Sequence, residues 1–261
     1  MLEPIAPSHQ RSVPGPALET GRFVDAATMD RDPMSEARCL SCILRESCMA
    51  ADLDRAELLK LDTVVRNGRS VRRGETLYRA GDPFRSLYAV RAGSFKSVVT
   101  HPSGRTHVTG FYLAGETLGL DAISTDSHRS DAIALEDSAV CVVPYRLLEA
   151  LCLEVRSIQQ YLHKILSAEI AREAGVMLLL GSLSADQRVA AFLLNISARH
   201  AARGYSAAEF TLRATREDIG SYLGMTLETV SRTLSRLQQA NLVRVEGKRM
   251  RLMDMEALDR L

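Results

Sequence analysis

The 261-residue sequence has no long apolar run and no large excess of either charge. Its longest uninterrupted apolar stretch is the six residues 189–194, whereas a transmembrane helix requires ~20. The first 35 residues are rich in proline and do not place a basic segment before an apolar one, so they lack the form of a secretory signal. We therefore expect a cytoplasmic protein without a membrane partner, and we expect residues 1–35 to be a flexible tail.

The net charge is only +1, from 33 Lys and Arg against 32 Asp and Glu, which at first disfavours a nucleic-acid partner. The charges are unevenly distributed, however, because residues 184–261 contain 12 basic against nine acidic side chains. The last third of the chain is therefore a candidate for DNA binding. A P-loop, G-x-G-x-x-G, H-E-x-x-H or G-x-S-x-G motif does not occur and the six histidines are dispersed, so the sequence does not predict an enzyme.

Glycines punctuate the chain between residues 74 and 119 and separate short β-rich runs. Such runs lie at 87–90, 96–99 and 107–111. Their spacing predicts a compact antiparallel β-roll or barrel in the first half of the chain.

The pattern changes to a helical period after Pro144. Steps of four, three, four and three residues, the spacing of a coiled-coil seam, connect one set of side chains: Leu166, Ile170, Glu173, Met177 and Leu180. We expect one long helix here that pairs with its copy in a homodimer. Two Glu173 carboxylates would repel each other in that dimer. The alternative is a helix packed on its own roll with Glu173 in water.

A helix predicted for residues 184–203 leads to a short strand, two further helices and a hairpin. Thr215 and Asp218 have the form of a capping box that starts one helix, and Thr226 caps the next after a turn at Gly224. Two short helices joined by a Gly-containing turn make a helix-turn-helix, whose second helix enters the major groove of DNA.

The exposed side chains predicted on that second helix are Glu228, Ser231 and Arg232, whose hydrogen-bonding groups suit cytosine, thymine and guanine edges. The alternative is an ordinary surface helix with a Glu228/Arg232 pair worth only ~0.2–0.5 kcal/mol. The hairpin expected over 242–252 has a Gly-Lys turn and is typical of a winged helix. Three basic side chains are candidates for phosphate contacts that position the domain: Arg216, Lys248 and Arg249.

Three of the five cysteines lie within ten residues, in the pattern C-x2-C-x5-C at Cys39, Cys42 and Cys48. In a reducing compartment this pattern indicates a metal or cluster site and not disulfides. A tetrahedral thiolate site needs a fourth ligand, for which Cys141 and Cys152 are the candidates. Cys152 is better explained as a small buried hydrophobe. Thiolate ligation by itself does not separate zinc from iron-sulfur.

The stretch 215–237 (TREDIGSYLGMTLETVSRTLSRL) resembles the helix-turn-helix of the Crp/Fnr regulators, and Glu228-x-x-Ser231-Arg232 is similar to the recognition set of the Fnr branch. The order of tail, roll, long helix and winged helix matches too, so the resemblance covers roughly residues 36–255. It implies an α+β protein with a cyclic-nucleotide-binding-like β-roll. It also implies a dimer that binds a TTGAT-type palindrome in double-stranded DNA and works with RNA polymerase.

The same resemblance favours an iron-sulfur cluster over zinc at the cysteine site. The spacing of the cysteines at 39, 42, 48 and 141 is similar to that of oxygen-sensing Fnr proteins, which hold an oxygen-labile 4Fe-4S cluster on these positions. An acidic residue on the dimer helix, here Glu173, is a feature of that branch. The resemblance therefore implies a regulator that dimerises and binds DNA when the cluster is present, under low oxygen.

Two alternatives stay open, a structural zinc site and a Crp-like regulator with a cyclic-nucleotide effector. Gly119 and Arg129-Ser130 resemble parts of the nucleotide site, but Leu120 stands where that site needs a carboxylate for the ribose. The expected division of the chain is a tail (1–35), a cysteine segment (36–50), a β-roll sensor (51–153), a dimerisation helix (154–183) and a winged-helix DNA-binding domain (184–261).

Overall fold

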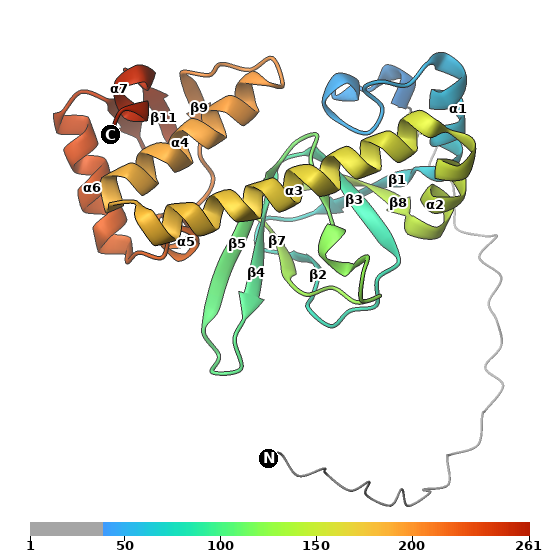
Figure 1. The fold of residues 1–261 in the computed structure, drawn as a ribbon, viewed down its shortest axis with the longest axis horizontal. Helices are drawn as coiled ribbons and strands as arrows, with labels where there is room; N and C mark the ends of the chain where they lie inside the picture. Colours follow the sequence, from blue (N-terminus) through green and yellow to red (C-terminus); the bar gives the residue numbers. More distant parts are fainter. Residues whose placement is uncertain (1–38) are drawn as a thin grey trace, which may run out of the picture. The chain divides into compact units, whose positions relative to one another are not determined.

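The structure is a computed structural model that describes residues 39–261 (Figure 1). The predicted flexible tail, residues 1–35, and the start of the predicted cysteine segment lie outside the described residues. Eight strands make up the roll: β1 (Arg66–Val71), β2 (Thr76–Tyr78), β3 (Ser86–Ala92), β4 (Ser94–Thr100), β5 (Thr106–Leu113), β6 (Thr117–Leu118), β7 (Asp131–Ala134) and β8 (Ser138–Pro144). The three β-rich runs predicted from the sequence lie in β3, β4 and β5.

These strands form two four-stranded antiparallel sheets, β1-β8-β3-β6 and β2-β7-β4-β5, which confirms the predicted antiparallel roll. Side chains from both sheets fill one core, in which Phe95, Leu118 and Val140 are almost fully buried. Gly93 turns the chain between β3 and β4 with φ of 82°, and a Cβ there would lie 2.1 Å from Ser138 Oγ. Only glycine fits this turn without displacing the neighbouring strand.

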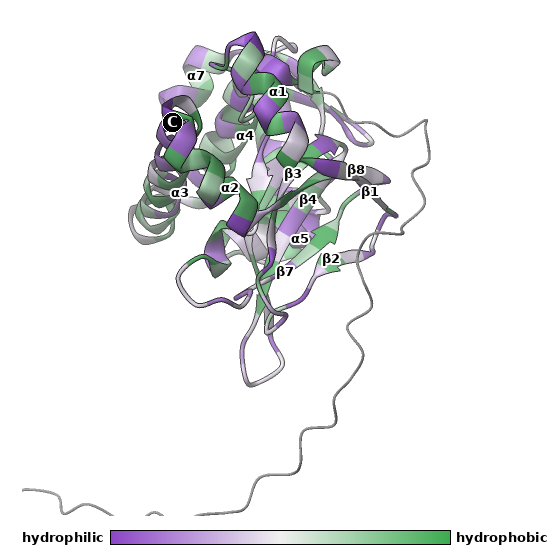
Figure 2. Ribbon diagram, turned by 90° about the vertical axis from the view of Figure 1, so that its right-hand side faces the viewer, coloured by the Kyte–Doolittle hydropathy of each residue, from purple (hydrophilic) through white to green (hydrophobic). Residues whose placement is uncertain are grey.

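Helices α1 (Arg55–Val64) and α2 (Tyr145–Glu154) pack with the first turns of α3 (Arg156–Ser182). Their buried side chains form one cluster with residues of the cysteine segment: Met49, Ala50, Leu53, Leu58, Leu61, Leu148, Leu151 and Ile158. Figure 2 shows both hydrophobic and hydrophilic residues along these helices, as expected where a helix buries only one face. The single long helix predicted after the roll is confirmed as α3, and α2 begins directly after Pro144, where the pattern was expected to become helical, whereas α1 lies inside the range 51–153 expected to form the roll.

The C-terminal part contains the elements α4 (Ala185–Ala201), β9 (Glu209–Thr211), α5 (Arg216–Leu223), α6 (Leu227–Gln239), β10 (Val243–Glu246), β11 (Arg249–Leu252) and α7 (Met255–Asp259). Strands β10 and β11 form the predicted hairpin, with Gly247 at φ 61° in its turn, and β9 pairs with β11. This arrangement confirms the predicted winged helix.

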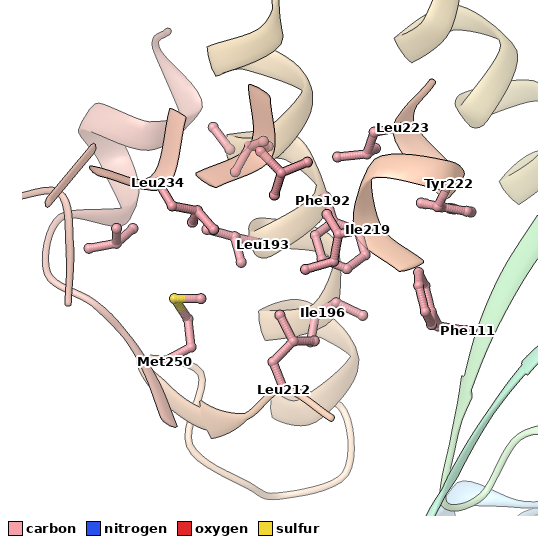
Figure 3. Packing of buried hydrophobic residues seen from close by; sticks show 14 of the residues in the cluster. Phe111, Phe192, Leu193, Ile196, Leu212, Ile219, Tyr222, Leu223, Leu234 and Met250 are labelled. Atoms are coloured by element: carbon pink, nitrogen blue, oxygen red, sulfur yellow. The ribbon is translucent and has the colours of Figure 1, made fainter. Parts of the chain in front are cut away.

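Figure 3 shows the core of the winged helix. Leu193 of α4, Ile219 of α5 and Leu234 of α6 belong to one buried cluster. Phe111 of β5 also belongs to it, and its ring centroid lies 5.2 Å from that of Tyr222 on α5. The first helix of the helix-turn-helix is therefore held by an aromatic contact with the roll. Among residues 39–261, no helix is long and apolar enough to cross a membrane.

Candidate nucleic-acid interface and candidate metal centre

Local hydrogen bonds set the two helices of the helix-turn-helix. Thr215 Oγ1 accepts a hydrogen bond from Asp218 N at 3.0 Å, and Asp218 Oδ2 accepts one from Thr215 N at 2.9 Å, so the predicted capping box starts α5. Thr226 Oγ1 accepts from Thr229 N at 3.2 Å and caps α6, as predicted. Gly224 ends α5 at φ 63°, in the left-handed region that favours glycine.

A second glycine in this motif has a role that the sequence pattern did not reveal. A Cβ on Gly220 would lie 2.6 Å from the carbonyl oxygen of Met225, which follows in the turn. Any side chain at position 220 would therefore push α5 away from the turn. Gly220 and Gly224 together fix the angle between α5 and α6.

Helix α6 buries one face and exposes the other. Val230, Leu234 and Leu237 face the core and are almost fully buried. Glu228 and Arg232 are exposed on the opposite face. A helix anchored in this way presents a fixed set of polar side chains outward.

The predicted reading residues hold no ion pair with each other. Arg232 Nε donates to the backbone oxygen of Glu228 at 3.4 Å, but among residues 39–261 no ion pair joins the two side chains. Ser231, between them, is half-buried. The pKa of Glu228 is lowered by hydrogen bonds from its own backbone N–H and from Thr226, and Arg232 lowers it further, so the two side chains still interact electrostatically on the exposed face of α6.

One helical turn further on, Arg236 forms an ion pair within the domain. Its Nη2 pairs with Asp186 Oδ1 of α4 and its Nε lies 3.3 Å from Asp186 Oδ2. Asp186 raises the pKa of Arg236, as expected for a cation held by a carboxylate. Arg236 therefore ties α6 to α4, while Arg232 extends into solvent.

The three predicted phosphate contacts lie in different environments. Lys248 is exposed in the hairpin turn. Arg249 is also exposed, but its Nε lies 3.0 Å from Glu209 Oε1. Arg216, in the first turn of α5, is half-buried, and burial lowers its pKa. Lys248 is thus the most accessible of the three cations.

The cysteine segment is anchored to the helical core. Cys39 lies in η1 (Cys39–Ser41), and Cys48 follows η2 (Arg45–Ser47). Cys39 N donates a hydrogen bond to Asp62 Oδ1 of α1 at 2.7 Å. Met49, one residue after Cys48, is buried in the cluster formed by α1, α2 and α3. These contacts hold the segment against α1 and the helical core.

The pKa shifts of the predicted ligands show which thiols interact with one another. The pKa of the Cys39 thiol is raised by burial and by Asp62, and further by Cys48 and Cys141. Burial raises the pKa of Cys141 despite the opposing effect of Arg91, and Cys42 and Cys48 raise it further. Cys39, Cys48 and Cys141 therefore each sense other thiols of the set, because a nearby like charge disfavours a second thiolate.

The fifth cysteine, Cys152, packs against the same helical core as Cys39 and Cys48, but its electrostatic environment differs. The pKa of Cys152 is raised by burial and by Glu149, and Cys152 is partly buried against the helical core. Among the described residues, no group of three or more Cys, His, Asp or Glu side chains is in metal-ligand geometry. The four predicted thiols suit a thiophilic group by their chemistry, but they are not closed around a common point, and burial keeps Cys39, Cys48 and Cys141 protonated. A metal or cluster would have to displace their protons.

Helix α3 packs on the roll with one face and exposes another. On the face toward the roll, the Arg172 guanidinium lies 4.8 Å from the Tyr112 ring centroid, and Tyr112 Oη donates to Glu169 Oε1 at 3.3 Å. The predicted seam lies on another face, where Ile170 is 69% and Met177 is 74% exposed. The other members of the seam differ in exposure: Glu173 is exposed, and Leu166 and Leu180 are half-buried.

Known proteins match the chain over most of its length. A Crp-like helix-turn-helix domain matches residues 187–261, and a cyclic nucleotide-binding domain matches residues 68–154. The chain is 43% identical over 233 residues to the transcriptional regulatory protein btr of Bordetella pertussis, an alignment that covers 88% of this chain and 96% of btr. It is 40% identical over 223 residues to the fumarate and nitrate reduction regulatory protein of Escherichia coli, covering 85% of this chain and 89% of that protein.

The transcriptional activator protein Anr of Pseudomonas protegens is 41% identical over 220 residues, covering 84% of this chain and 90% of Anr. Among solved structures, FixK2 from Bradyrhizobium japonicum matches with a TM-score of 0.70 and 33% identity, covering 76% of this chain and 97% of FixK2. The curated relatives are transcription regulators, so the expectation that the chain is not an enzyme is confirmed.

Proposed function

The chain belongs to the Crp/Fnr family of DNA-binding transcription regulators, and from this premise we propose that it responds to oxygen through an iron-sulfur cluster. With the cluster bound, under low oxygen, it dimerises and binds a TTGAT-type palindrome, where it works with RNA polymerase. The observation that carries the proposal is the set of four cysteines from two separate parts of the chain: three in the C-x2-C-x5-C pattern at Cys39, Cys42 and Cys48, and Cys141 in β8, whose thiol is near enough to interact with that of Cys39.

Cys39, Cys42, Cys48 and Cys141 would hold a 4Fe-4S cluster, whose oxygen lability supplies the signal. The chain's own contribution is to keep these thiols beside one another and partly shielded from water. Because burial raises the pKa values of Cys39, Cys48 and Cys141, they stay protonated when no cation is present. Ligation therefore releases protons, and acid favours loss of the cluster.

The cysteine segment is coupled to the dimerisation helix. Burial raises the pKa of Tyr161 on α3 to about 12, and the Cys48 thiol adds to this rise. Ile158, three residues earlier, is buried in the same core as Met49. Ordering of the segment by a cluster therefore acts on the first turns of α3.

The exposed seam of α3 is the proposed dimer interface. Ile170 and Met177 leave apolar surface in water that a second copy would cover. Glu173 lies between them and would meet its own copy, so the carboxylate pair opposes association. A shift from 1:99 to 99:1 in favour of the dimer requires ~5.5 kcal/mol of differential stabilisation, which the cluster has to provide through α3.

Purification without oxygen tests the proposal. We expect a coloured protein with a visible iron-sulfur absorption band that carries about four iron and four sulfide per chain and bleaches in air. Cys141→Ala should lose the band, whereas the matched control Cys152→Ala should retain it. A colourless protein that carries zinc, or equal loss of the band in both variants, would overturn the cluster assignment.

A further inference from the structure

The turn between β6 and β7 contains an acidic side chain that is surrounded by donors. Asp121 Oδ2 accepts hydrogen bonds from two consecutive backbone amides, Arg129 N at 2.8 Å and Ser130 N at 3.2 Å. The Ser130 hydroxyl donates to the same oxygen at 3.2 Å. Three donors thus converge on one carboxylate oxygen.

Consecutive backbone N–H groups that point to one place form a concave site for an anion. In this turn the anion is the carboxylate of Asp121, a side chain of the protein itself. The amides and the hydroxyl come from residues 129–130, while the carboxylate comes from eight residues earlier, so the contact also closes the turn. Ser130 is buried, so its amide and hydroxyl are shielded from bulk water, whereas the hydrogen bond from Arg129 N is exposed.

A buried histidine points to the same place independently. His128 is 3% exposed and its ring stacks on Tyr78, with centroids 3.7 Å apart. Its Nδ1 lies 3.6 Å from Asp121 Oδ1 and, among the described residues, makes no hydrogen bond. The backbone at Gly119 lies close to the His128 ring, since a Cβ there would be 3.4 Å from His128 Cε1. Its φ of 94° is also in the region that favours glycine. One polar atom therefore faces the carboxylate without reaching it.

The charge around this turn favours an oxyanion. The Arg129 side chain is exposed, and within residues 39–261 it makes no ion pair. The turn lies inside residues 68–154, which match a cyclic nucleotide-binding domain, but Leu120 next to Asp121 offers only an apolar side chain. The turn therefore has an anion site and no partner for a sugar hydroxyl.

We propose that Asp121 is a built-in anion that fills a small oxyanion site of the roll, so that the native protein takes no phosphate or carboxylate effector there. The site binds a free oxyanion of the size of formate or inorganic phosphate only when the Asp121 carboxylate is removed.

The competing explanation is that Asp121 is an ordinary turn cap. The two explanations differ in whether the negative charge of Asp121 is needed. Asn caps a turn as well as Asp does, so a cap predicts that Asp121→Asn changes little. A built-in anion predicts that Asp121→Asn loses the charge-assisted bonds and lowers the melting temperature, while the amide still fills the space and excludes an added anion.

Chemical rescue tests the proposal on the full chain. Wild type, Asp121→Ala, Asp121→Asn and the exposed control Asp259→Ala are melted in chloride, formate and inorganic phosphate at matched ionic strength, and phosphate binding is titrated by calorimetry. We expect formate or phosphate to raise the melting temperature of Asp121→Ala alone, with a phosphate Kd at least about tenfold lower than in wild type.

Phosphate binding by wild type with Asp121 in place would overturn the proposal, as would an Asp121→Ala protein that is as stable as wild type and unaffected by either anion. If Asp121→Ala does not fold in any buffer, Asp121→Asn decides. A melting temperature equal to that of wild type would reduce Asp121 to a turn cap, and a lower one that no anion restores supports the built-in anion.

Discussion

Glu116, in the turn between β5 and β6, offers a quantitative test of how the winged helix is held on the roll. Its carboxylate accepts from Arg199 Nη2 at 2.5 Å and from Arg203 Nη2 at 2.5 Å. All three side chains are largely buried, with Glu116 21% exposed. Arg203 Nε also donates to Ala114 O at 2.5 Å. Glu116→Gln keeps the shape and removes the charge that both cations face.

Breaking a buried ion pair by removal of one partner costs ~3–5 kcal/mol, because the other charge is left uncompensated. The cost should be smaller at this site, since Glu116 is partly exposed and Arg199 and Arg203 keep carbonyl acceptors. We expect about 2–3 kcal/mol, which corresponds to a fall of about 1 M in the urea midpoint.

The effect has a defined pH dependence. Burial alone would raise the pKa of Glu116, but Arg199 and Arg203 together hold it below the ordinary value of 4.5. A depressed folded-state pKa stabilises the fold above the unfolded-state pKa, and this contribution is lost as the pH falls through the folded-state value. The stability difference between wild type and Glu116→Gln should therefore be full at pH 7 and should shrink below pH 4.5.

Urea unfolding followed by circular dichroism at pH 7 and at acid pH measures both quantities. The matched control is Glu246→Gln, because the Glu246 and Arg244 side chains form an exposed pair 3.6 Å apart. Such a pair contributes at most ~1 kcal/mol. If Glu116→Gln shifts the midpoint no more than Glu246→Gln, or if the difference does not depend on pH, the ion-pair explanation is refuted.

Three further outcomes are expected. Arg232→Ala should weaken binding to a TTGAT palindrome by ~1–3 kcal/mol while leaving scrambled DNA nearly unaffected in fluorescence anisotropy, whereas Lys248→Ala should weaken both alike. Glu173→Ala should raise the dimer fraction in air by sedimentation, and an unchanged fraction would remove Glu173 from the switch. Thr215→Ala should destabilise the winged helix by ~1 kcal/mol in urea unfolding, with Thr215→Ser as the conservative control that retains the cap.

The features that the sequence predicted correctly depend on neighbours along the chain. The Thr215 cap joins residues three positions apart, and the hairpin turn at Gly247 joins adjacent strands. Local hydrogen bonds and turn chemistry are visible in the order of residues. The spacing of Cys39, Cys42 and Cys48 is equally visible in the order of residues, and their role as ligands stays a prediction.

Contacts between distant residues were not predictable. Glu116 meets Arg199 across 83 positions, and the partners of Asp121 depend on how the turn before β7 folds back. Gly220 looks like an ordinary helix residue until the carbonyl of Met225 is placed 2.6 Å from its missing Cβ. Packing of this kind depends on the tertiary arrangement. The periodicity of apolar residues and the secondary-structure propensity of each residue contain no information about it.

One tertiary contact links the cysteine segment to the turn that holds the winged helix. Gly115 has φ of 90°, and a Cβ there would lie 2.7 Å from the carbonyl oxygen of Ser47, the residue before Cys48. Glu116, the next residue, holds Arg199 and Arg203 of the winged-helix domain. Packed interfaces change between discrete arrangements and do not deform continuously. On the proposed function, a displacement of the cysteine segment would act on the turn at Gly115 and on α3 together, so we expect dimerisation and the seating of the DNA-binding domain to respond to the same event.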